Sequence, residues 1–500
     1  MHPTIDAASV VIVTAADSVA VALRDLVPGE EFDVPQGRLR VRESVGRGHK
    51  IAVHPIAEGD TVLKYGAPIG VATRDIAAGE HVHTHNVGSA LQQSGTYDYA
   101  GRSAATAPAS APVSGFAGYR RADGRVGTRN EIWIIATVGC VASVCQEIAR
   151  QSAVTDLQGV DGVFAITHPF GCSQLGSDLD DTRNILAALA RHPNAGGVVF
   201  VGLGCESNQL GGLVKAAGID PKRVRTVLSQ EAADEIDAGV DAVSELASEL
   251  AQDRREPCAI SDLVIGLKCG GSDGFSGLSA NPLLGAISDR ITAAGGSAIL
   301  TEIPEIFGAE HLLLERATDR ETFDSLANLV NDFKGYFVAH GERVDENPSP
   351  GNKAGGITTL AEKSLGAVQK AGQAPVKDVI RYGALRRTAG LSILEAPGND
   401  AVSSTALAAA GATLILFTTG RGTPLGFPAP TVKIASNAAL AARKPRWIDF
   451  DASPLLAGEP METVSGRFLD YLRAVASGQP TRNELNGERS IAIWKRGVTL

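Results

Sequence analysis

Four of the six cysteines follow apolar, strand-like segments, where a thiol can reach a ligand site. Cys140, Cys172, Cys205 and Cys269 each stand beside glycine and polar residues just past such a segment. Ligands of an open parallel sheet bind outside the carboxyl ends of the strands, so the four thiols could converge there. Thiolates favour iron, zinc and iron–sulfur clusters. The pattern predicts a thiolate metal site, against the alternative that each cysteine is a small buried apolar residue.

The two remaining cysteines fit that structural alternative. Cys145 lies at the start of an apolar helix and Cys258 lies in a connection. The absence of a Cys-x2-Cys pair argues against a zinc finger. Six cysteines in 500 residues are also too few for a disulfide scaffold.

Histidines form a second candidate group near the N-terminus. His81, His83 and His85 alternate with other residues in the run GEHVHTHN, and His49 lies in the sequence RGHK. Residues two apart in a strand share a face, so the three could project together. Such a group can ligate a metal or move a proton, and a solvated edge strand is the alternative.

Polar loops supply candidate substrate ligands. The segment CGGSDGFSGLSANP (269–282) can form an anion-binding nest, and it lacks a nucleotide-binding signature. Lys353 lies in a loop of small residues, where a lysine can bind an anion or act as a base. Arg421 lies in a glycine turn and can hold a carboxylate with two hydrogen bonds. An ordinary surface role is the alternative for Lys353 and Arg421.

The elements that must position these residues divide the chain into three parts. Short strands punctuated by glycine turns predict a small β-rich module over 1–93, and an Ala/Ser/Pro/Gly-rich stretch over 94–115 predicts a flexible linker. Beyond it, apolar runs alternate with helical segments, which is typical of parallel α/β sheets. We place a boundary at 258, between a middle α/β domain over 116–258 and a C-terminal domain over 259–500. The expected strands there include 132–138, 162–167, 197–204, 262–267, 297–301, 391–395 and 413–417.

Charge and hydropathy exclude several classes of protein. Lys and Arg total 46 against 56 Asp and Glu, a net charge of −10, which argues against nucleic-acid binding. No apolar run is long enough to cross a membrane, and the N-terminus lacks the basic start of a signal peptide, so we expect a cytoplasmic protein. Glycine is in excess, with 56 residues, which predicts close backbone approaches.

These motifs together resemble the altronate/galactarate dehydratase family of sugar-acid lyases. The matching stretches span nearly the whole chain, and they include RGHK (47–50), KYGAPIG (64–70), GEHVHTHN (79–86), TVGC (137–140), GCSQLG (171–176), GLGCE (202–206), CGGSDGFSGLSANP (269–282), NPSPGNKAGGITTLAEKSLG (347–366) and FTTGRGTP (417–424). The resemblance implies an N-terminal SAF-type β-clip domain, a middle dimerisation domain and a C-terminal Rossmann-like domain. It also implies a homodimer and dependence on Fe²⁺, as one ion or a cluster, with Mn²⁺ as the other candidate ion.

The implied reaction is loss of water from D-altronate, which gives 2-dehydro-3-deoxy-D-gluconate. Galactarate or a related hydroxy acid is the alternative substrate, and a non-catalytic sugar-acid-binding protein is the alternative class. We expect the cysteines to hold iron and a lysine, a histidine or an acid to move protons. The candidate catalytic residues are Lys353, His83, His85 and Asp273, and the candidate substrate ligands are His49, Arg129, Asn130, Gly270, Gly271, Ser272, Asn352 and Arg421.

Overall fold

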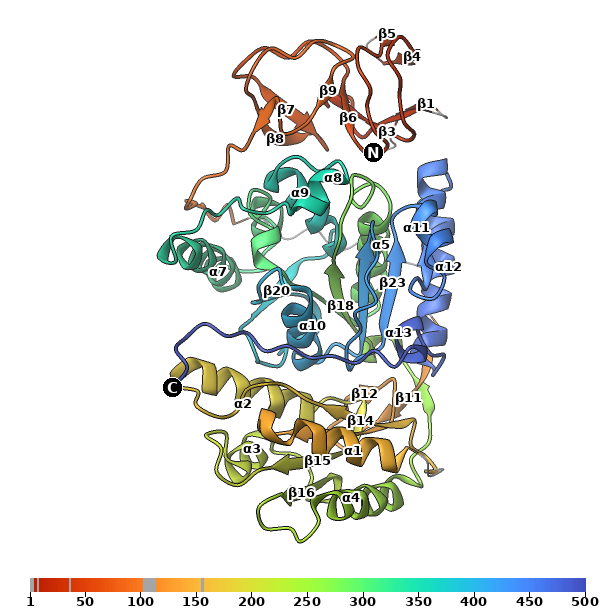
Figure 1. Ribbon diagram of the computed structural model, residues 1–500. Coiled ribbons are helices and arrows are strands. Elements are labelled where there is room, and N and C mark those ends of the chain that lie inside the picture. Colours follow the sequence, from red (N-terminus) through yellow and green to blue (C-terminus); the bar gives the residue numbers. More distant parts are fainter. Residues whose placement is uncertain (1–3, 7–8, 36, 102–113, 154–156) are drawn as a thin grey trace.

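The chain folds into three stacked bodies, which Figure 1 shows as an N-terminal β module, a C-terminal α/β domain beneath it and a middle α/β domain at the far end. The structure is a computed structural model that describes residues 4–6, 9–35, 37–101, 114–153 and 157–500. The C-terminal domain is therefore the central body, although the middle domain precedes it in sequence. The expected class, α/β with a β-rich N-terminal module, is confirmed.

The N-terminal module consists of short antiparallel strands. Its two larger sheets have the strand orders β1-β2-β3-β6-β9 and β10-β8-β7, and β4 pairs with β5. Tight turns join the strands, so the buried valine and isoleucine side chains come from many short segments. The strands are β1 (Thr4–Asp6), β2 (Val10–Ile12), β3 (Val19–Ala22), β4 (Glu31–Val34), β5 (Gly37–Arg40), β6 (Lys50–Ala52), β7 (Thr61–Lys64), β8 (Ala67–Ala72), β9 (His81–Val82) and β10 (Val87–Gly88).

The described part of the expected linker packs against the C-terminal domain. The Tyr97 hydroxyl donates to Glu310 Oε1 at 2.6 Å, and the Tyr99 ring lies 5.3 Å from the Phe323 ring. Two tyrosines thus supply contacts that the small residues of 94–101 lack, and the flexibility of the linker stays a prediction. The rest of the expected linker, 102–113, lies outside the described residues.

The middle domain contains a four-stranded parallel sheet in the order β14-β13-β15-β16. Side chains of its central strand alternate between two cores, Trp133 and Ile135 on one face and Ile132 and Ile134 on the other. A small antiparallel sheet, β12-β11-β17, joins the chain entering this domain to the chain leaving it, near the expected boundary at 258. The elements are β11 (Phe116–Arg120), β12 (Val126–Gly127), β13 (Glu131–Ala136), α1 (Ala142–Ser152), β14 (Gly162–Ile166), α2 (Gly176–Ala190), β15 (Ala195–Gly202), α3 (Leu210–Ala217), β16 (Val224–Leu228), α4 (Glu235–Leu250) and β17 (Glu256–Cys258).

The C-terminal domain contains a seven-stranded parallel sheet in the order β20-β21-β19-β18-β22-β23-β24. Its central strands are buried along their whole length, as expected for a parallel sheet covered by helices. Its strands are β18 (Val264–Cys269), β19 (Ser297–Leu300), β20 (Val376–Ile380), β21 (Gly390–Leu394), β22 (Leu414–Thr419), β23 (Thr431–Ala435) and β24 (Phe450–Asp451). Its helices are α5 (Ala280–Ala293), α6 (His311–Leu314), α7 (Arg320–Ala339), α8 (Pro350–Ala354), α9 (Leu360–Ala367), α10 (Asp400–Ala409), α11 (Ala438–Arg443), α12 (Met461–Ala476) and α13 (Arg482–Leu485).

Each expected strand of the two α/β domains overlaps an observed one. Among the helices of the C-terminal domain, α6 is a single turn. Within the described residues, no helix combines the length and apolar character that a membrane crossing requires.

Candidate functional site

Most of the candidate polar residues lie at the carboxyl edge of the seven-stranded sheet. β18 ends at Cys269 and continues into the loop 270–279, whereas Arg421 follows β22. The helix α8 carries Lys353 to the same edge, since a Cβ on Gly351 would lie 3.8 Å from Arg421 Nε. Crossover connections of a parallel sheet bring such loops together from distant parts of the chain. This edge is the candidate active site.

The N-terminal module covers this edge through backbone contacts that exclude side chains. A Cβ on Gly274 would lie 2.0 Å from the Gly48 carbonyl oxygen, and one on Gly356 would lie 2.1 Å from the same atom. Real Cβ atoms never approach a backbone oxygen so closely, so only glycine permits this packing. The glycine excess therefore has a specific use, which is to let three backbone segments meet at the site.

Buried charges hold the module in this position. Glu362 of α9 accepts from Lys50 Nζ at 2.8 Å and from Lys64 Nζ at 2.8 Å, and all three side chains are buried. Lys50 also donates to the Gly356 carbonyl at 2.6 Å. Burial opposes the charge of Glu362, but the two ammonium groups lower the pKa of the carboxyl to about 2. Burial and the neighbouring Lys64 lower the pKa of Lys50 to about 8 despite its contact with Glu362.

Four histidines from the module form one cluster over the edge. The His49 ring lies 5.1 Å from that of His81 and 5.0 Å from that of His83, and His85 lies 5.3 Å from His81. The expected strand over 81–85 is wrong beyond Val82, because a turn follows β9. The histidines gather through this turn and through His49 on a neighbouring segment, and not through period-two alternation.

Contacts with the C-terminal domain orient the histidines. His83 Nδ1 lies 2.9 Å from Thr358 Oγ1, and His49 Nε2 lies 3.4 Å from the Ala354 carbonyl oxygen. Burial, with the positive charges of neighbouring groups, lowers the pKa of His81 to about 3 and that of His83 to about 4. These imidazoles are therefore neutral near pH 7, and neutral rings can accept a proton or bind a metal.

Two cations on the segments beside this cluster have hydrogen-bond donors to spare. In the described part of the chain, the Lys353 ammonium has no hydrogen-bond or ion-pair partner, although its side chain is half-buried. Arg421 is exposed and uses one nitrogen, Nη1, to donate to the Gly351 carbonyl at 3.2 Å. Gly271 lies beside it, since a Cβ there would be 3.5 Å from Arg421 Cβ. Lys353, Arg421 and the Gly270–Ser272 loop thus form a place where an anion can bind.

Asp273 and Asn352 hydrogen-bond to the surrounding loops, which leaves few of their polar atoms free to bind a substrate. Asp273 accepts from Ser436 Oγ at 2.8 Å and from Asn437 Nδ2 at 2.9 Å, and it also accepts from Ser276 and the Phe275 N–H. Burial raises the pKa of Asp273. Asn352 donates to the Ser272 carbonyl at 2.9 Å and accepts from Lys363 Nζ at 3.1 Å. The structure therefore supports a positioning role for both residues.

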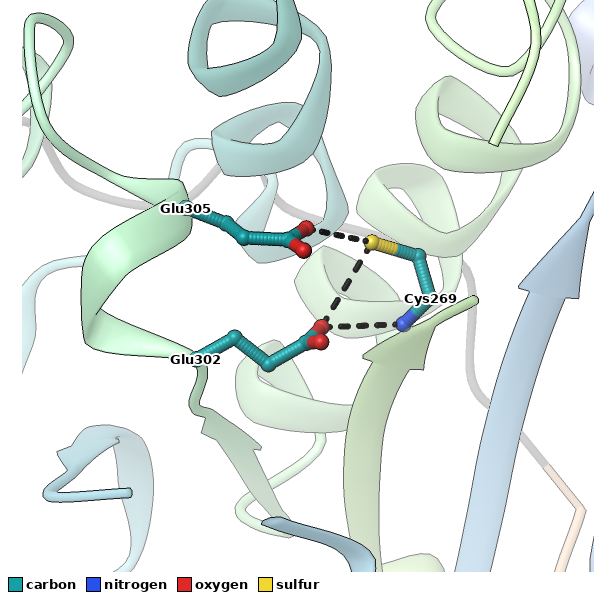
Figure 2. A group of neighbouring side chains, drawn as sticks. All are labelled: Cys269, Glu302 and Glu305. Atoms are coloured by element: carbon teal, nitrogen blue, oxygen red, sulfur yellow. Dashed lines mark hydrogen bonds between the residues drawn. The ribbon is translucent and has the colours of Figure 1, made fainter. Parts of the chain in front are cut away.

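Cys269 lies beneath this surface in a buried acidic group, which Figure 2 shows with Glu302 and Glu305. Its thiol donates to Glu305 Oε2 at 3.3 Å and to Glu302 Oε2 at 3.5 Å. Burial and the charge of Glu302 raise the pKa of this thiol to about 12. The three ligand atoms lie within 4.8 Å of one another, a spacing that could admit an ion. Binding of an ion here would require this thiol to lose its proton.

Buried lysines already neutralise this acidic group. Lys370 Nζ lies 2.8 Å from Cys269 Sγ, Lys363 pairs with Glu305 at 2.8 Å, and Lys268 pairs with Glu302. A divalent ion would have to compete with three ammonium groups, so we assign this network a structural role.

Sequence reasoning missed these lysines, together with Lys50, Lys64 and Glu362. The one sequence signal was their place inside apolar, strand-like or helical segments, where a lysine needs a buried partner.

The four candidate metal cysteines do not form one site. Cys140, Cys172 and Cys205 are exposed and belong to the middle domain, whereas Cys269 is buried in the C-terminal domain. The prediction that all four converge is corrected on this point, because the two α/β domains have separate sheets and therefore separate carboxyl edges.

Arg129 and Asn130 lie away from the candidate site and are saturated by protein contacts. Arg129 pairs with Glu484 at 2.7 Å and donates to the Val475 and Gln479 carbonyls. Asn130 donates to the Gly159 carbonyl at 2.6 Å. Neighbouring Thr128 donates to the carbonyl of Thr413, which precedes β22, so these residues face the amino edge of the large sheet. These contacts join the two α/β domains, and the expected role of both residues in substrate binding stays a prediction.

Fold and site together define a three-domain α/β protein with a polar site between a β module and the carboxyl edge of a Rossmann-like sheet. Three family models match successive parts of the chain: "Altronate/galactarate dehydratase SAF domain" over 8–90, "D-galactarate dehydratase/Altronate hydrolase, second domain" over 118–251, and "D-galactarate/Altronate dehydratase, C-terminal" over 260–499. The chain belongs to the altronate/galactarate dehydratase family.

Relatives match over almost the whole length. The chain is 50% identical to the altronate dehydratase of Escherichia coli (strain K12), over 97% of this chain and 99% of that protein. It is 49% identical to the altronate dehydratase of Bacillus subtilis (strain 168), over 97% of this chain and 98% of that protein. Identity to the galactarate dehydratase (L-threo-forming) of Escherichia coli (strain K12) is 33%, over 93% of this chain and 92% of that protein.

Proposed function

We propose that this protein is a hydro-lyase that converts D-altronate to 2-dehydro-3-deoxy-D-gluconate. One observation carries the choice of substrate: identity to two altronate dehydratases is 50% and 49%, whereas identity to a galactarate dehydratase is 33%. The site is consistent with a sugar acid, since it combines free cations for a carboxylate with imidazoles for proton transfer.

The reaction requires removal of a weakly acidic proton from C2 and departure of the hydroxyl group from C3. Negative charge develops on the carboxylate as the C2 proton leaves, so fixed cations stabilise the transition state. In this site Arg421 offers a planar pair of donors to the substrate carboxylate. The unpaired ammonium of Lys353 lies on the same side and adds positive charge where the enediolate forms.

We assign proton removal to His83 and proton donation to Lys353. His83 Nδ1 is held by Thr358 Oγ1 at 2.9 Å, which leaves Nε2 free to accept the C2 proton. Lys353 carries its protons without an internal partner and can donate one to the departing C3 hydroxyl. The resulting enol then gains a proton at C3 and loses the proton of its 2-hydroxyl group to become the 2-keto acid. His85 is exposed, and among the described residues its ring contacts only the ring of His81. We therefore give His85 no role in the reaction.

His49 and His81 fit the ferrous ion that the family resemblance implies. His49 Nδ1 and His81 Nε2 lie 3.1 Å apart. The two ring nitrogens are close enough to hydrogen-bond to each other, and as neutral imidazole nitrogens they would be the ligands that hold the ion. When bound, such an ion supplies Lewis-acid polarisation of the substrate carboxylate and 2-hydroxyl group. Mn²⁺ satisfies the same ligands and is the alternative ion.

The test is an anaerobic assay of the iron-loaded protein with altronate, galactarate and mannonate as separate substrates. We expect a 2-keto acid product from altronate, with kcat/KM higher than for the other two acids. Preference for galactarate would replace the proposed substrate with that of the more distant relative. Absence of product from all three acids, with iron bound, would overturn the proposed enzymatic function.

A further inference from the structure

Three cysteines outside the candidate active site lie on neighbouring loops of the middle domain. Cys172, Cys140 and Cys205 follow β14, β13 and β15, which are adjacent in that order in the sheet. Their loops touch directly: the Gly139 N–H donates to the Phe170 carbonyl at 2.8 Å, and the Asn208 N–H donates to the Gly171 carbonyl at 2.9 Å. Three thiols therefore share one edge of one parallel sheet.

All three thiols are exposed, which is unusual for cysteine. Cys140, Cys172 and Cys205 are open to solvent, whereas the other three cysteines of the chain are buried. Cysteine is among the most often buried residue types when its role is packing. The six cysteines therefore divide into three that pack in the interior and three whose thiols are accessible to a ligand.

Buried polar side chains hold the three loops in place. Asn208 donates from Nδ2 to the Thr137 carbonyl at 3.1 Å, and Glu206 accepts from Thr137 Oγ1 at 2.5 Å. His168 Nε2 lies 2.9 Å from the Ala136 carbonyl oxygen, and its Nδ1 accepts from the Phe170 N–H at 3.1 Å. A frame of this kind fixes ligands before the metal binds. It also uses both nitrogens of His168, so that residue adds no further ligand.

A cluster accommodates sulfur atoms that are more widely spaced than the ligands of a single ion. In the described ranges, the one trio of His, Cys, Asp or Glu ligand atoms lying within 4.8 Å of one another belongs to Cys269, Glu302 and Glu305. The three exposed sulfurs are therefore spread more widely than this. A tetrahedral zinc with bonds of about 2.3 Å needs its sulfurs only ~3.8 Å apart. A cluster binds each thiolate through a different iron and so spans a wider triangle.

We propose that Cys140, Cys172 and Cys205 bind a [4Fe–4S] cluster, with one iron left without a protein ligand. Each thiol loses its proton as its sulfur bonds to an iron. The helices α2 and α3 begin shortly after Cys172 and Cys205, so the positive ends of their dipoles face the anionic cluster. The open iron gives this edge a coordination position for water or for an oxygen ligand.

The test uses full-length protein purified without oxygen and reconstituted with iron salts and sulfide under a thiol reductant. We expect about four iron atoms and four acid-labile sulfides per chain, with visible sulfide-to-iron absorbance. Each of Cys140→Ser, Cys172→Ser and Cys205→Ser removes most of the sulfide and the absorbance. Cys258→Ser is the matched control and keeps both. Circular dichroism shows whether each variant is folded, and the exposed positions of the three cysteines make folded variants the expected result.

Two results overturn the proposal. One is wild-type protein with no more sulfide than the three variants, including the case in which one zinc or iron ion binds without sulfide. The other is a disulfide between two of these cysteines that persists in the anaerobic protein. Sulfide is measured without turnover, and the histidine site contains no thiolate. Failure of the cluster is therefore distinguishable from failure of the proposed dehydratase activity.

Discussion

Two carboxyl edges of parallel sheets in this protein carry cysteine, and their surroundings are opposite. At the edge of the C-terminal sheet, Cys269 is buried among lysines and glutamates, and the N-terminal module covers the loops above it. At the edge of the middle sheet, Cys140, Cys172 and Cys205 are exposed. The same topological position therefore serves two different purposes. We propose that the covered edge, with its paired charges, binds an anionic substrate and that the exposed thiols of the other edge bind a metal cluster.

Both edges nevertheless contain backbone conformations that residues other than glycine rarely adopt. Among the described residues, three that are not glycine have a positive φ, and two of them lie at these edges: Ser173 at 55° and Glu302 at 69°. The third, Tyr65, belongs to the module beside the covered edge, with a φ of 64°. Such conformations persist where the surrounding structure holds them, and they are enriched at functional sites. The backbone is thus constrained at both edges, whereas the side chains at the two edges offer different chemistry.

The largest effect should come from removing the free cation of the covered edge. Lys353→Met deletes an ammonium group that has no structural partner among the described residues, so the fold should be unaffected. Loss of a positioned proton donor lowers kcat by about 10²–10⁴-fold. Steady-state assay with altronate checks this. Lys222→Met removes an exposed lysine of the middle domain and should leave kcat unchanged. An unchanged kcat in Lys353→Met would remove Lys353 from the mechanism.

The second-largest effect should come from removing the buried carboxylate that holds the N-terminal module over the candidate active site. Glu362→Gln leaves Lys50 and Lys64 buried without a counter-charge, which costs about 3–5 kcal/mol. Urea unfolding followed by circular dichroism measures the loss. Glu147→Gln is the control, because Glu147 pairs with Arg150 at the surface and its replacement should have no measurable effect. Equal stability of the two variants would show that the buried ion pairs do not hold the module in place.

Sequence reasoning predicted the fold class and the strands of the two α/β domains well because their signals are local. Apolar runs bounded by glycine reveal buried parallel strands, and the loops after them supplied Arg421 and the glycine-rich segment. Lys353 was expected in a loop, but it lies on the short helix α8. The histidine cluster was also predicted, although through the wrong geometry. What brings His49 to His83 is the pairing of β6 with β9, which no local pattern specifies.

Contacts distant in sequence account for what sequence reasoning missed. Glu362 lies 312 residues from Lys50, so neither residue alone indicates a buried ion pair. Cys269 and Cys140 both lie at the carboxyl end of a strand. Only the assignment of those strands to two different sheets shows that the two cysteines belong to different sites. Arg129 looked like an anion ligand in a basic turn, but its partner Glu484 lies near the other end of the chain. Residue type and spacing therefore indicate candidate chemistry, and topology decides which candidates share a site.

The smallest effect should come from relieving backbone constraint at the open edge. Ser173 adopts a left-handed conformation with a φ of 55° beside Cys172. Glycine tolerates this conformation better, although it also loses more freedom on folding. We therefore expect Ser173→Gly to raise the unfolding free energy by about 0.5–1 kcal/mol, measured as a higher thermal midpoint. Ser173→Ala keeps the constraint and should not be stabilised. If Ser173→Gly is no more stable than Ser173→Ala, the left-handed backbone at Ser173 has no energetic cost. The loop at the edge of the middle sheet is then not held under constraint.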